Sequence, residues 1–439
     1  MNRNSPGTIS RSRRRLVTGL AIVGIAGLLA GCAGDGGETT ADPEGYTPPD
    51  ADFAAEITYG VWDQNQVEAI EANIEGFNEL YPNIDVNVNV TPWGEYWTKL
   101  QTQGASANLP DLFWMNGPNF QLYASNGLFA PITSVIEEGS IDPSNYPAAL
   151  VDLYAYEGEQ YGVPKDFDTI AVWYNKALFE QAGVEEPQPG WTWEDFHAKA
   201  KAISDALADD GIYGVATATD RQAGYYNQII QAGGFIIEDG ETGWGTPEAA
   251  AGIQFTADLI ADGSSPNIQQ LSDTPGLTWF TSGKAAMHQG GSWLRNAMVD
   301  SEVAEDVGVV PLPVNERPAT IIHGLTNVVS AGSENKQAAF ALQAYLASEE
   351  AQRQQGEMGA IIPAFNGTQQ AFVDSIPEYD LQVFLDAIEY SYPYPVSENT
   401  SAWAALELEL LPDAFSGARP VADVNAELGT KVQELLDAE

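Results

Sequence analysis

The sequence is poor in cysteine, histidine and basic residues, and each shortage excludes a class of site or partner. Its 439 residues include one cysteine and three histidines. A single cysteine allows no intramolecular disulfide, and three scattered histidines predict no metal site. Lys and Arg number 18 against 62 Asp and Glu, which gives a formal net charge of −44 at pH 7. Such a surface repels phosphates, so nucleic acid is excluded as a partner.

The N-terminus has the pattern of an export signal. Residues 1–31 contain five arginines and no acidic residue, and the apolar run over residues 16–30 is too short to span a bilayer. The L-A-G-C motif at residues 29–32 resembles the bacterial lipobox. This resemblance implies a lipid anchor on Cys32, at the extracellular face of the cell membrane. Residues 12–17 also resemble a twin-arginine signal, so Sec and twin-arginine export both stay open.

After the signal, the sequence predicts a short tether followed by two lobes. Residues 32–53 are rich in Gly, Thr, Pro and acidic residues, which predicts a flexible acidic tether. The remaining stretch is too long for one hydrophobic core, so we expect two lobes. Without the signal arginines, 13 basic residues stand against 62 acidic ones spread along the chain. This spread is typical of a solvated acidic surface, although it also leaves a cationic ligand open.

The beginning of the folded part predicts an open parallel sheet. Its apolar periodicity predicts strands over 57–62, 84–90 and 111–115, separated by helices over 67–80 and 95–105. Ligands of such sheets bind beyond the carboxyl ends of the strands. Trp62, Asp63 and Asn116 stand at two of these ends and are therefore candidate ligand-binding residues. Core packing of the aromatic ring and a turn-forming Asn are their structural alternatives.

A central segment places two carboxylates before a buried strand. Residues 161–183 read Y-G-V-P-K-D-F-D-T-I-A-V-W-Y-N-K-A-L-F-E-Q-A-G, which predicts a turn, a strand and a helix capped by Asn175. Asp166 and Asp168 would lie at the mouth of this strand, where such sheets bind ligands. Two residues apart in an extended segment, they should point to opposite faces, which argues against a catalytic pair.

No sequence motif predicts catalysis or a cofactor. The chain contains no G-x-S-x-G, no H-E-x-x-H and no P-loop. We therefore expect a binding protein without enzymatic activity or cofactor. A secreted glycoside hydrolase, which would also be acidic and rich in aromatic residues, stays as the alternative.

Five sequence segments occur in a recognisable order, and the first of them lies within the central segment described above. They are Y-G-V-P-K-D-F-D with W-Y-N-K-A-L-F-E (161–180), W-T-W-E-D-F (191–196), F-T-S-G-K-A-A-M with G-G-S-W (280–293), G-V-V-P-L-P (308–313) and S-E-N-K-Q-A-A-F-A-L-Q-A-Y-L (333–346). In this order they resemble the extracellular solute-binding proteins of bacterial ABC sugar importers, which are relatives of maltose-binding protein.

The resemblance implies an α/β fold of two lobes, each a mostly parallel sheet flanked by helices, with a hinge between them. The implied crossings are residues 165–169 and a second segment near Asn327. The first lobe would comprise residues 54–167 with about 327–370, and the second residues 168–326 with about 371–439. The ligand would lie in the cleft between the lobes, which close on it.

The function implied is that of a lipid-anchored, monomeric receptor. It would bind a mono- or oligosaccharide and deliver it to the transmembrane subunits of an ABC permease. The wider family also binds polyamines and ferric ion, so the same fold with a non-sugar ligand stays open. The adjacent Tyr225 and Tyr226, together with the excess of acidic residues, support this alternative.

Sugar binding calls for aromatic rings that stack on C–H faces and for planar groups that bond hydroxyls. By resemblance, Trp293 matches a sugar-stacking Trp, and Asp168 matches a ligand-binding carboxylate. Tyr225 and Tyr226 are adjacent on a predicted helix, so only one of them should face the cleft. His323 stands just before the second crossing. The full predicted set is Trp62, Asp63, Asn116, Asp166, Asp168, Tyr225, Tyr226, Trp244, Trp293, Arg295 and His323.

Overall fold

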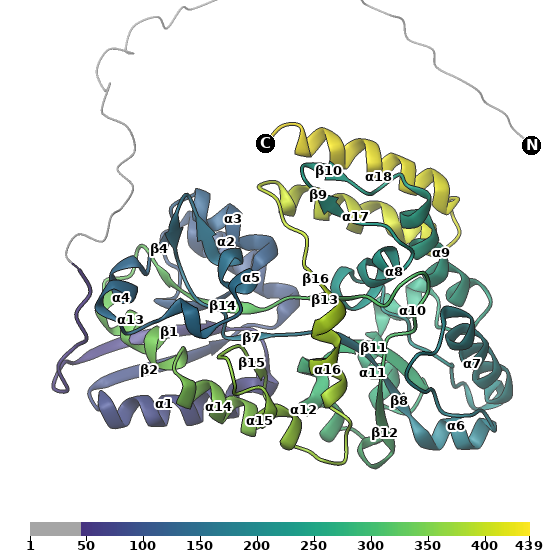
Figure 1. Cartoon of the computed structure of the whole chain (residues 1–439), viewed down its shortest axis with the longest axis horizontal. Helices are drawn as coiled ribbons and strands as arrows, with labels where there is room; N and C mark the ends of the chain where they lie inside the picture. The colour runs from purple at the N-terminus through teal and green to yellow at the C-terminus, as the bar shows by residue number, and fades with distance from the viewer. Residues whose placement is uncertain (1–44) are drawn as a thin grey trace, which may run out of the picture. The chain divides into compact units, whose positions relative to one another are not determined.

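The computed structural model describes residues 45–439 (Figure 1). The predicted signal peptide, the lipidation at Cys32 and most of the tether lie outside the described residues. The end of the tether prediction is wrong, because the chain already packs at Tyr46. This ring is buried and meets Phe340 at a centroid distance of 5.9 Å. Gln337 also donates a hydrogen bond to the Thr47 carbonyl. An isolated aromatic residue among polar ones is enough to anchor this stretch on the core.

The larger sheet in the described chain has the strand order β2-β1-β3-β14-β4. Its strands are β1 (Ala55–Val61), β2 (Ile84–Val90), β3 (Leu112–Asn116), β4 (Phe129–Ala130) and β14 (Leu325–Ser330). The first three strands are parallel, as predicted, and β14 runs antiparallel to both β3 and β4. Because β14 comes much later in the chain than β3 and β4, the sheet is completed by a segment that returns from far along the sequence.

Helices of the expected amphipathic kind accompany this sheet. In α1 the apolar residues Ile70, Ile74 and Phe77 recur at spacings of three and four, and all are buried. The helices here are α1 (Val67–Leu80), α2 (Trp93–Ala105), α3 (Gly117–Ser125), α4 (Thr133–Glu138), α5 (Ala148–Val151), α13 (Lys336–Leu346), α14 (Glu349–Glu357) and α15 (Gln370–Asp374).

The second sheet has the order β11-β8-β12, formed by β8 (Ile170–Asn175), β11 (Met287–Gly291) and β12 (Val307–Pro311). Both pairings are antiparallel, so the prediction of a mostly parallel sheet in each lobe is wrong here. The prediction assumed that the helix after β8 crosses over to a parallel neighbour. The neighbours of β8 instead come from much later in the chain. In this part of the described chain, parallel pairing occurs at the isolated bridges of Tyr213 with Ala285, Ala216 with His288 and Thr192 with Val314, and between residues 320–322 and 391–393.

The remaining helices belong to this part of the chain, and α18 packs beside β10 (Figure 1). They are α6 (Lys176–Ala182), α7 (Trp193–Ala206), α8 (Tyr226–Gln231), α9 (Pro247–Ala261), α10 (Ile268–Asp273), α11 (Gly276–Thr281), α12 (Arg295–Val299), α16 (Gln382–Asp386), α17 (Thr400–Phe415) and α18 (Val421–Leu436). Short strand pairs are β5 (Ala155–Tyr156) with β6 (Glu159–Gln160), β7 (Asp166–Phe167) with β15 (Ile362–Pro363), β9 (Ile237–Glu238) with β10 (Glu241–Thr242), and β13 (Thr320–Ile322) with β16 (Ser391–Pro393).

Local sequence signals explain where the central strand and its helix begin and end. Every residue of β8 is buried, as its unbroken apolar run predicts. The Asn175 side chain accepts a hydrogen bond from the Leu178 amide and caps α6, which ends at Gly183 in the left-handed conformation. Thr192 and Asp195 form a capping box at the start of α7.

The two segments that were expected to cross between sheets pair with each other. The Lys165 amide donates to the Leu325 carbonyl at 2.7 Å, and Asp168 and His323 exchange two backbone hydrogen bonds. His323 and Gly324 separate β13 (Thr320–Ile322) from β14. A Cβ atom at Gly324 would lie 2.3 Å from the Asp166 carbonyl oxygen, so only glycine fits this close approach. Figure 1 shows the β7 and β13–β14 segments running alongside one another.

Within residues 45–439, no helix combines the length and apolar character that a bilayer crossing requires.

Candidate ligand-binding site

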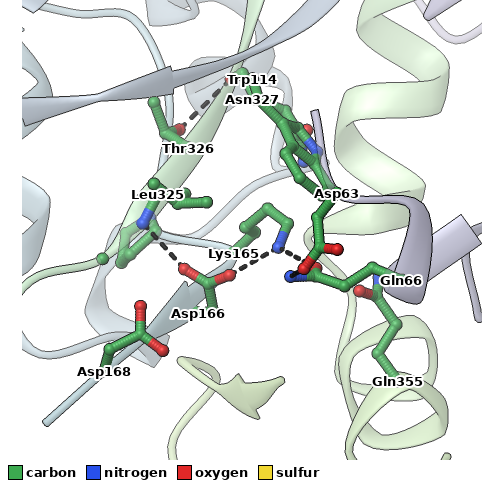
Figure 2. Close-up of polar contacts among 12 residues, drawn as sticks. Asp63, Gln66, Trp114, Lys165, Asp166, Asp168, Leu325, Thr326, Asn327 and Gln355 are labelled. Carbon is green, nitrogen blue, oxygen red and sulfur yellow. Dashed lines mark hydrogen bonds and ion pairs between the residues drawn. The ribbon is translucent and has the colours of Figure 1, made fainter. Parts of the chain in front are cut away.

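A buried lysine is the centre of the candidate site, and sequence reasoning placed it only in the hinge (Figure 2). Lys165 is 3% exposed, and its Nζ lies 2.5 Å from Asp166 Oδ2 and 3.1 Å from Gln66 Oε1. The same Nζ lies 4.5 Å from the ring centroid of Trp114, within cation–π range. Trp114 is itself fixed by a hydrogen bond from its Nε1 to the Tyr59 hydroxyl. Lys165 therefore ties the crossing segment to the residues that follow β1 and to β3.

The two predicted carboxylates of this segment have different surroundings. Asp166 has both oxygens engaged, because Oδ2 pairs with Lys165 and Oδ1 accepts from the Leu325 amide at 2.8 Å. These bonds connect the two crossing segments. Asp168 accepts a single side-chain hydrogen bond within the described chain, from Ser292 Oγ at 2.9 Å.

Burial and the neighbouring charge of Asp166 raise the pKa of Asp168 well above its ordinary value. The Ser292 hydrogen bond and the charge of Lys165 oppose this rise. Asp168 is thus a buried carboxyl group with unused acceptor capacity, and a hydroxyl group of a ligand could fill that capacity.

Trp293 belongs to the 3₁₀ turn Ser292–Leu294, directly after β11. Its ring is half-buried against apolar side chains near both sheets. A Cβ atom at Gly291 would lie 1.8 Å from the ring, so the glycine allows Trp293 to lie against the backbone. Since Ser292 bonds Asp168, the turn brings Trp293 to the same site.

Trp62 follows β1 and lies in an aromatic group. Its ring centroid lies 5.3 Å from that of Trp93, 5.0 Å from Tyr96, 5.7 Å from Trp97 and 4.9 Å from Trp114. Most of these contacts are edge-on, a favourable arrangement for aromatic pairs. Trp62 keeps partial exposure, whereas Trp114 is fully buried.

Asp63 caps the 3₁₀ turn Gln64–Gln66 and shapes the loop after β1. Its carboxylate accepts from the Asn65 amide at 2.9 Å and from Gln66 Nε2 at 3.2 Å. The Asn65 carbonyl accepts from Asn296 Nδ2, on α12, at 3.1 Å. The loop after β1 and the start of α12 therefore touch, and both lie next to the crossing segment.

Asn116 and His323 together secure the start of α3. Asn116 Oδ1 accepts from the Asn119 amide at 3.2 Å, and His323 Nε2 accepts from the Gly117 amide at 3.2 Å. Burial lowers the pKa of His323 to about 4, so the ring is neutral at pH 7. Both predicted residues therefore already form hydrogen bonds within the protein.

Tyr225, Tyr226 and Trp244 all donate hydrogen bonds to the buried carboxylate of Glu407, at 2.9–3.2 Å. Arg221 completes this group, which we call the Glu407 cluster, with an ion pair of 2.7 Å. Only one of these adjacent tyrosines was expected to face the cleft, and the structure gives both hydroxyl groups the same internal partner. The backbone changes at Gly224 from a π-helical turn to α8, and both hydroxyl groups reach one acceptor. The phenol groups that kept a ferric site open are therefore bound to Glu407.

Arg295, at the start of α12, is engaged by other parts of the chain. Its guanidinium donates to Asn296 Oδ1 at 2.7 Å and to the Ser375 carbonyl at 2.9 Å. Its position is also fixed by Gly359, where a Cβ atom would lie 2.3 Å from the guanidinium carbon.

The structure thus sorts the predicted residues into separate groups. Contacts connect Trp62, Asp63, Asp166, Asp168 and Trp293 into one site, together with Gln66, Trp114, Lys165 and Ser292, which were not predicted. Gln66 and Trp114 lie outside the quoted motifs, so no local motif identifies them, whereas Lys165 lies inside the Y-G-V-P-K-D-F-D motif. Ser292 could have been found, because it lies inside the G-G-S-W motif.

Two hollows lie away from this site. One, of about 240 Å³, lies beside α2 and includes Thr91 and Lys99 in its lining. The other, of about 460 Å³, lies between α7 and α9 and includes Trp193 and Phe255. Neither contains a predicted binding residue. Among residues 45–439, no group of three or more His, Cys, Asp and Glu side chains is placed to hold a metal ion.

Sequence comparison finds relatives among sugar-binding proteins. The chain is 24% identical over 336 residues to the diacetylchitobiose binding protein of Streptomyces coelicolor, covering 74% of this chain and 76% of that protein. It is 27% identical over 259 residues to the lactose-binding protein of Rhizobium radiobacter, covering 56% of this chain and 58% of that protein.

Solved structures share the fold. An ABC substrate-binding protein of Listeria monocytogenes in complex with cycloalternan matches with a TM-score of 0.82 and 27% identity, over 88% of this chain and 100% of that one. Maltose-bound MalE3 of T. maritima matches with a TM-score of 0.75 and 20% identity, over 87% of this chain and 100% of that one. The second likeness supports the fold alone.

Residues 63–353 match the model of the bacterial extracellular solute-binding proteins. The predicted α/β fold of periplasmic binding proteins is confirmed by the neighbouring structures. The family consists of non-catalytic ABC substrate-binding proteins, which confirms the expectation that the chain is not an enzyme. The chain belongs to the bacterial extracellular solute-binding protein family.

Proposed function

We propose that this protein captures a saccharide at the site around Lys165 and Asp168 and delivers it to the transmembrane subunits of an ABC permease. One observation supports this most directly. The loop after β1 and the turn after β11 both bond the crossing segment, through Gln66–Lys165 at 3.1 Å and Ser292–Asp168 at 2.9 Å. A ligand there would meet groups from both sheets, which ligand-driven closure requires.

The chemistry of the site supports a sugar. Trp62 and Trp293 offer partly exposed aromatic rings, and Asp168 offers a buried acceptor. Aromatic rings stack on the C–H faces of a sugar, and a carboxylate accepts from its hydroxyl groups. Relatives named for diacetylchitobiose and lactose, and a neighbouring structure holding cycloalternan, support an oligosaccharide.

The two lobes would comprise residues 54–167 with about 327–370, and residues 168–326 with about 371–439. The larger sheet falls in the first of these sets, apart from the first two residues of β14, and the antiparallel sheet falls in the second. Lipidation of Cys32 would anchor the receptor, as a monomer, on the extracellular face of the membrane.

A thermal-shift screen tests the ligand class. The chain from residue 33 onward would be heated with mono- and oligosaccharides, with spermidine and with ferric citrate. A ligand at 100 times its dissociation constant should stabilise by about 2.7 kcal/mol, or about 5–10 °C. A shift with saccharides supports the proposal. A shift with spermidine or iron alone, or consumption of the sugar, would contradict it.

Trp293→Ala tests the site itself. We expect this variant to lose saccharide binding, measured by calorimetry, while its unliganded melting temperature stays within a few degrees of wild type. The half-buried ring should contribute more to ligand stacking than to the core. Trp279→Ala is the matched control, because Trp279 packs on Tyr213, away from the site, at a centroid distance of 5.5 Å. A large loss of unliganded stability in Trp293→Ala would mark the ring as core.

A further inference from the structure

Trp93 is an exposed aromatic side chain at the beginning of α2. It is 53% exposed, and the other strongly exposed large apolar side chains in the described chain are aliphatic: Leu80, Leu122, Ile388 and Leu408. A single exposed apolar residue is ordinary in a folded protein. What distinguishes Trp93 is therefore not its exposure but the residues that it contacts.

A row of aromatic rings connects Trp93 to the candidate site. The Trp93 ring meets Trp62 at a centroid distance of 5.3 Å, and Trp62 meets Trp114 at 4.9 Å. The Nζ of Lys165 lies 4.5 Å from Trp114. The row therefore runs from an exposed ring, through a half-buried one, to the buried charges of the crossing segment. Trp62 is also the direct neighbour of Asp63.

The position of Trp93 is fixed by the backbone and by its neighbours. Pro92 restricts its own φ, and its carbonyl accepts from the Glu95 and Tyr96 amides at 2.9 and 3.0 Å. The Trp93 ring meets the rings of Trp62 and Trp97 edge-on, at interplanar angles of 68° and 89°. Neither neighbour is stacked parallel on the Trp93 ring, and more than half of its surface is open. An ordered, open aromatic surface can bind a flat apolar face with little loss of conformational entropy.

We propose that Trp93 stacks on an additional sugar ring, beyond the one held near Asp168 and Trp293, and so selects oligosaccharides over monosaccharides. This inference rests on the proposed function, because it extends the same site outward. The ligand class is a neutral oligosaccharide, with one ring near Asp168 and Trp293 and a further ring on Trp93. Neutrality follows from the acidic surroundings, which would repel an anionic chain.

Isothermal titration across two length series tests the proposal. The probes are glucose, maltose, maltotriose and maltotetraose, and N-acetylglucosamine with its β-1,4 oligomers of two to four units. In the series that wild type binds, Trp93→Ala should weaken the trisaccharide and longer members by about tenfold and leave the monosaccharide unchanged. Trp93→Phe should recover most of the loss. Leu408→Ala, which removes an exposed apolar side chain on α17, should leave every affinity as in wild type.

The outcomes separate this inference from the function on which it rests. If Trp93→Ala changes no affinity, or weakens all lengths equally, the outer stacking position is overturned and the sugar receptor stands. If wild type binds only monosaccharides, the inference is likewise overturned. If wild type binds no member of either series, the proposed function fails, and this inference fails with it. Unliganded melting temperatures of all variants check that each one folds.

Discussion

The Glu407 cluster and the site around Asp168 both place a carboxylate among aromatic rings with one basic residue nearby. They differ in how many hydrogen bonds the carboxylate accepts. Glu407 receives hydrogen bonds from Arg221, Tyr225, Tyr226 and Trp244. Asp168 receives one from Ser292 within the described chain, and its nearest basic residue, Lys165, pairs with Asp166 instead.

This difference distinguishes a structural group from a candidate binding group of similar composition. A buried carboxylate whose acceptor sites are filled holds helices together, whereas one with unfilled sites can accept from a ligand. Both places combine a carboxylate with aromatic side chains, so residue type alone does not separate them. The count of internal partners does.

The largest expected effect comes from breaking the filled cluster. Glu407→Ala should reduce the free energy of unfolding by about 3–5 kcal/mol, because it leaves Arg221 without its buried partner. Urea unfolding monitored by circular dichroism would measure this. Glu427→Ala, which removes an exposed partner of Arg419 and Lys431, is the control and should leave the unfolding midpoint unchanged. A small effect of Glu407→Ala would mean that the cluster is not structural.

A smaller effect is expected from His323, which is bonded through its backbone to Asp168. Its folded-state pKa of about 4 lies below the unfolded value of about 6.5, so the unfolded chain binds more protons between these pH values. Wild type should therefore lose up to about 3 kcal/mol of stability as pH falls from 6.5 to 4. His323→Gln, which keeps a neutral acceptor, should lose less. Parallel pH profiles for both proteins would contradict the assignment.

The smallest expected effect sharpens the comparison at Asp168. Asp168→Asn should weaken saccharide binding by about tenfold, since losing a hydrogen bond and leaving its buried partner unsatisfied costs about 1–3 kcal/mol. The raised pKa means that the folded protein binds more protons than the unfolded chain, so wild-type stability falls as pH rises above about 4.

The variant should lack this fall. Calorimetry and unfolding from pH 4 to 7 would measure both effects. Equal affinity in the two proteins would argue that Asp168 does not contact the ligand.

Local signals predicted the elements of the fold well. The periodicity of α1, the alternation in β2 and the cap at Asn175 each depend on residues within one turn or strand. The direction of the strands beside β8 was not predictable in this way. Their pairing depends on segments that meet only after most of the chain has folded back.

The same distinction holds for the candidate site. Trp62, Asp63 and Asp168 were predicted because strand ends and motifs mark them, and the structure places all three around Lys165. Lys165 was assigned only to the hinge, although its buried contacts with Gln66 and Trp114 make it central. The prediction of Tyr225, Tyr226 and Trp244 as ligand residues could not take their acceptor into account. Glu407 lies far away in the sequence, and no local pattern indicates that these side chains bond to it.

The close approach at Gly324 limits how the two sheets can rearrange. The paired segments that hold it have a fixed register, and the absent side chain lets the backbones nearly touch. Sliding one of the paired segments along the other would break the hydrogen bonds between them in turn. Twisting the two segments together would keep these hydrogen bonds. The pairing therefore favours twisting over sliding as an opening motion, and the distance between two probes placed on either side of the pair would follow that motion.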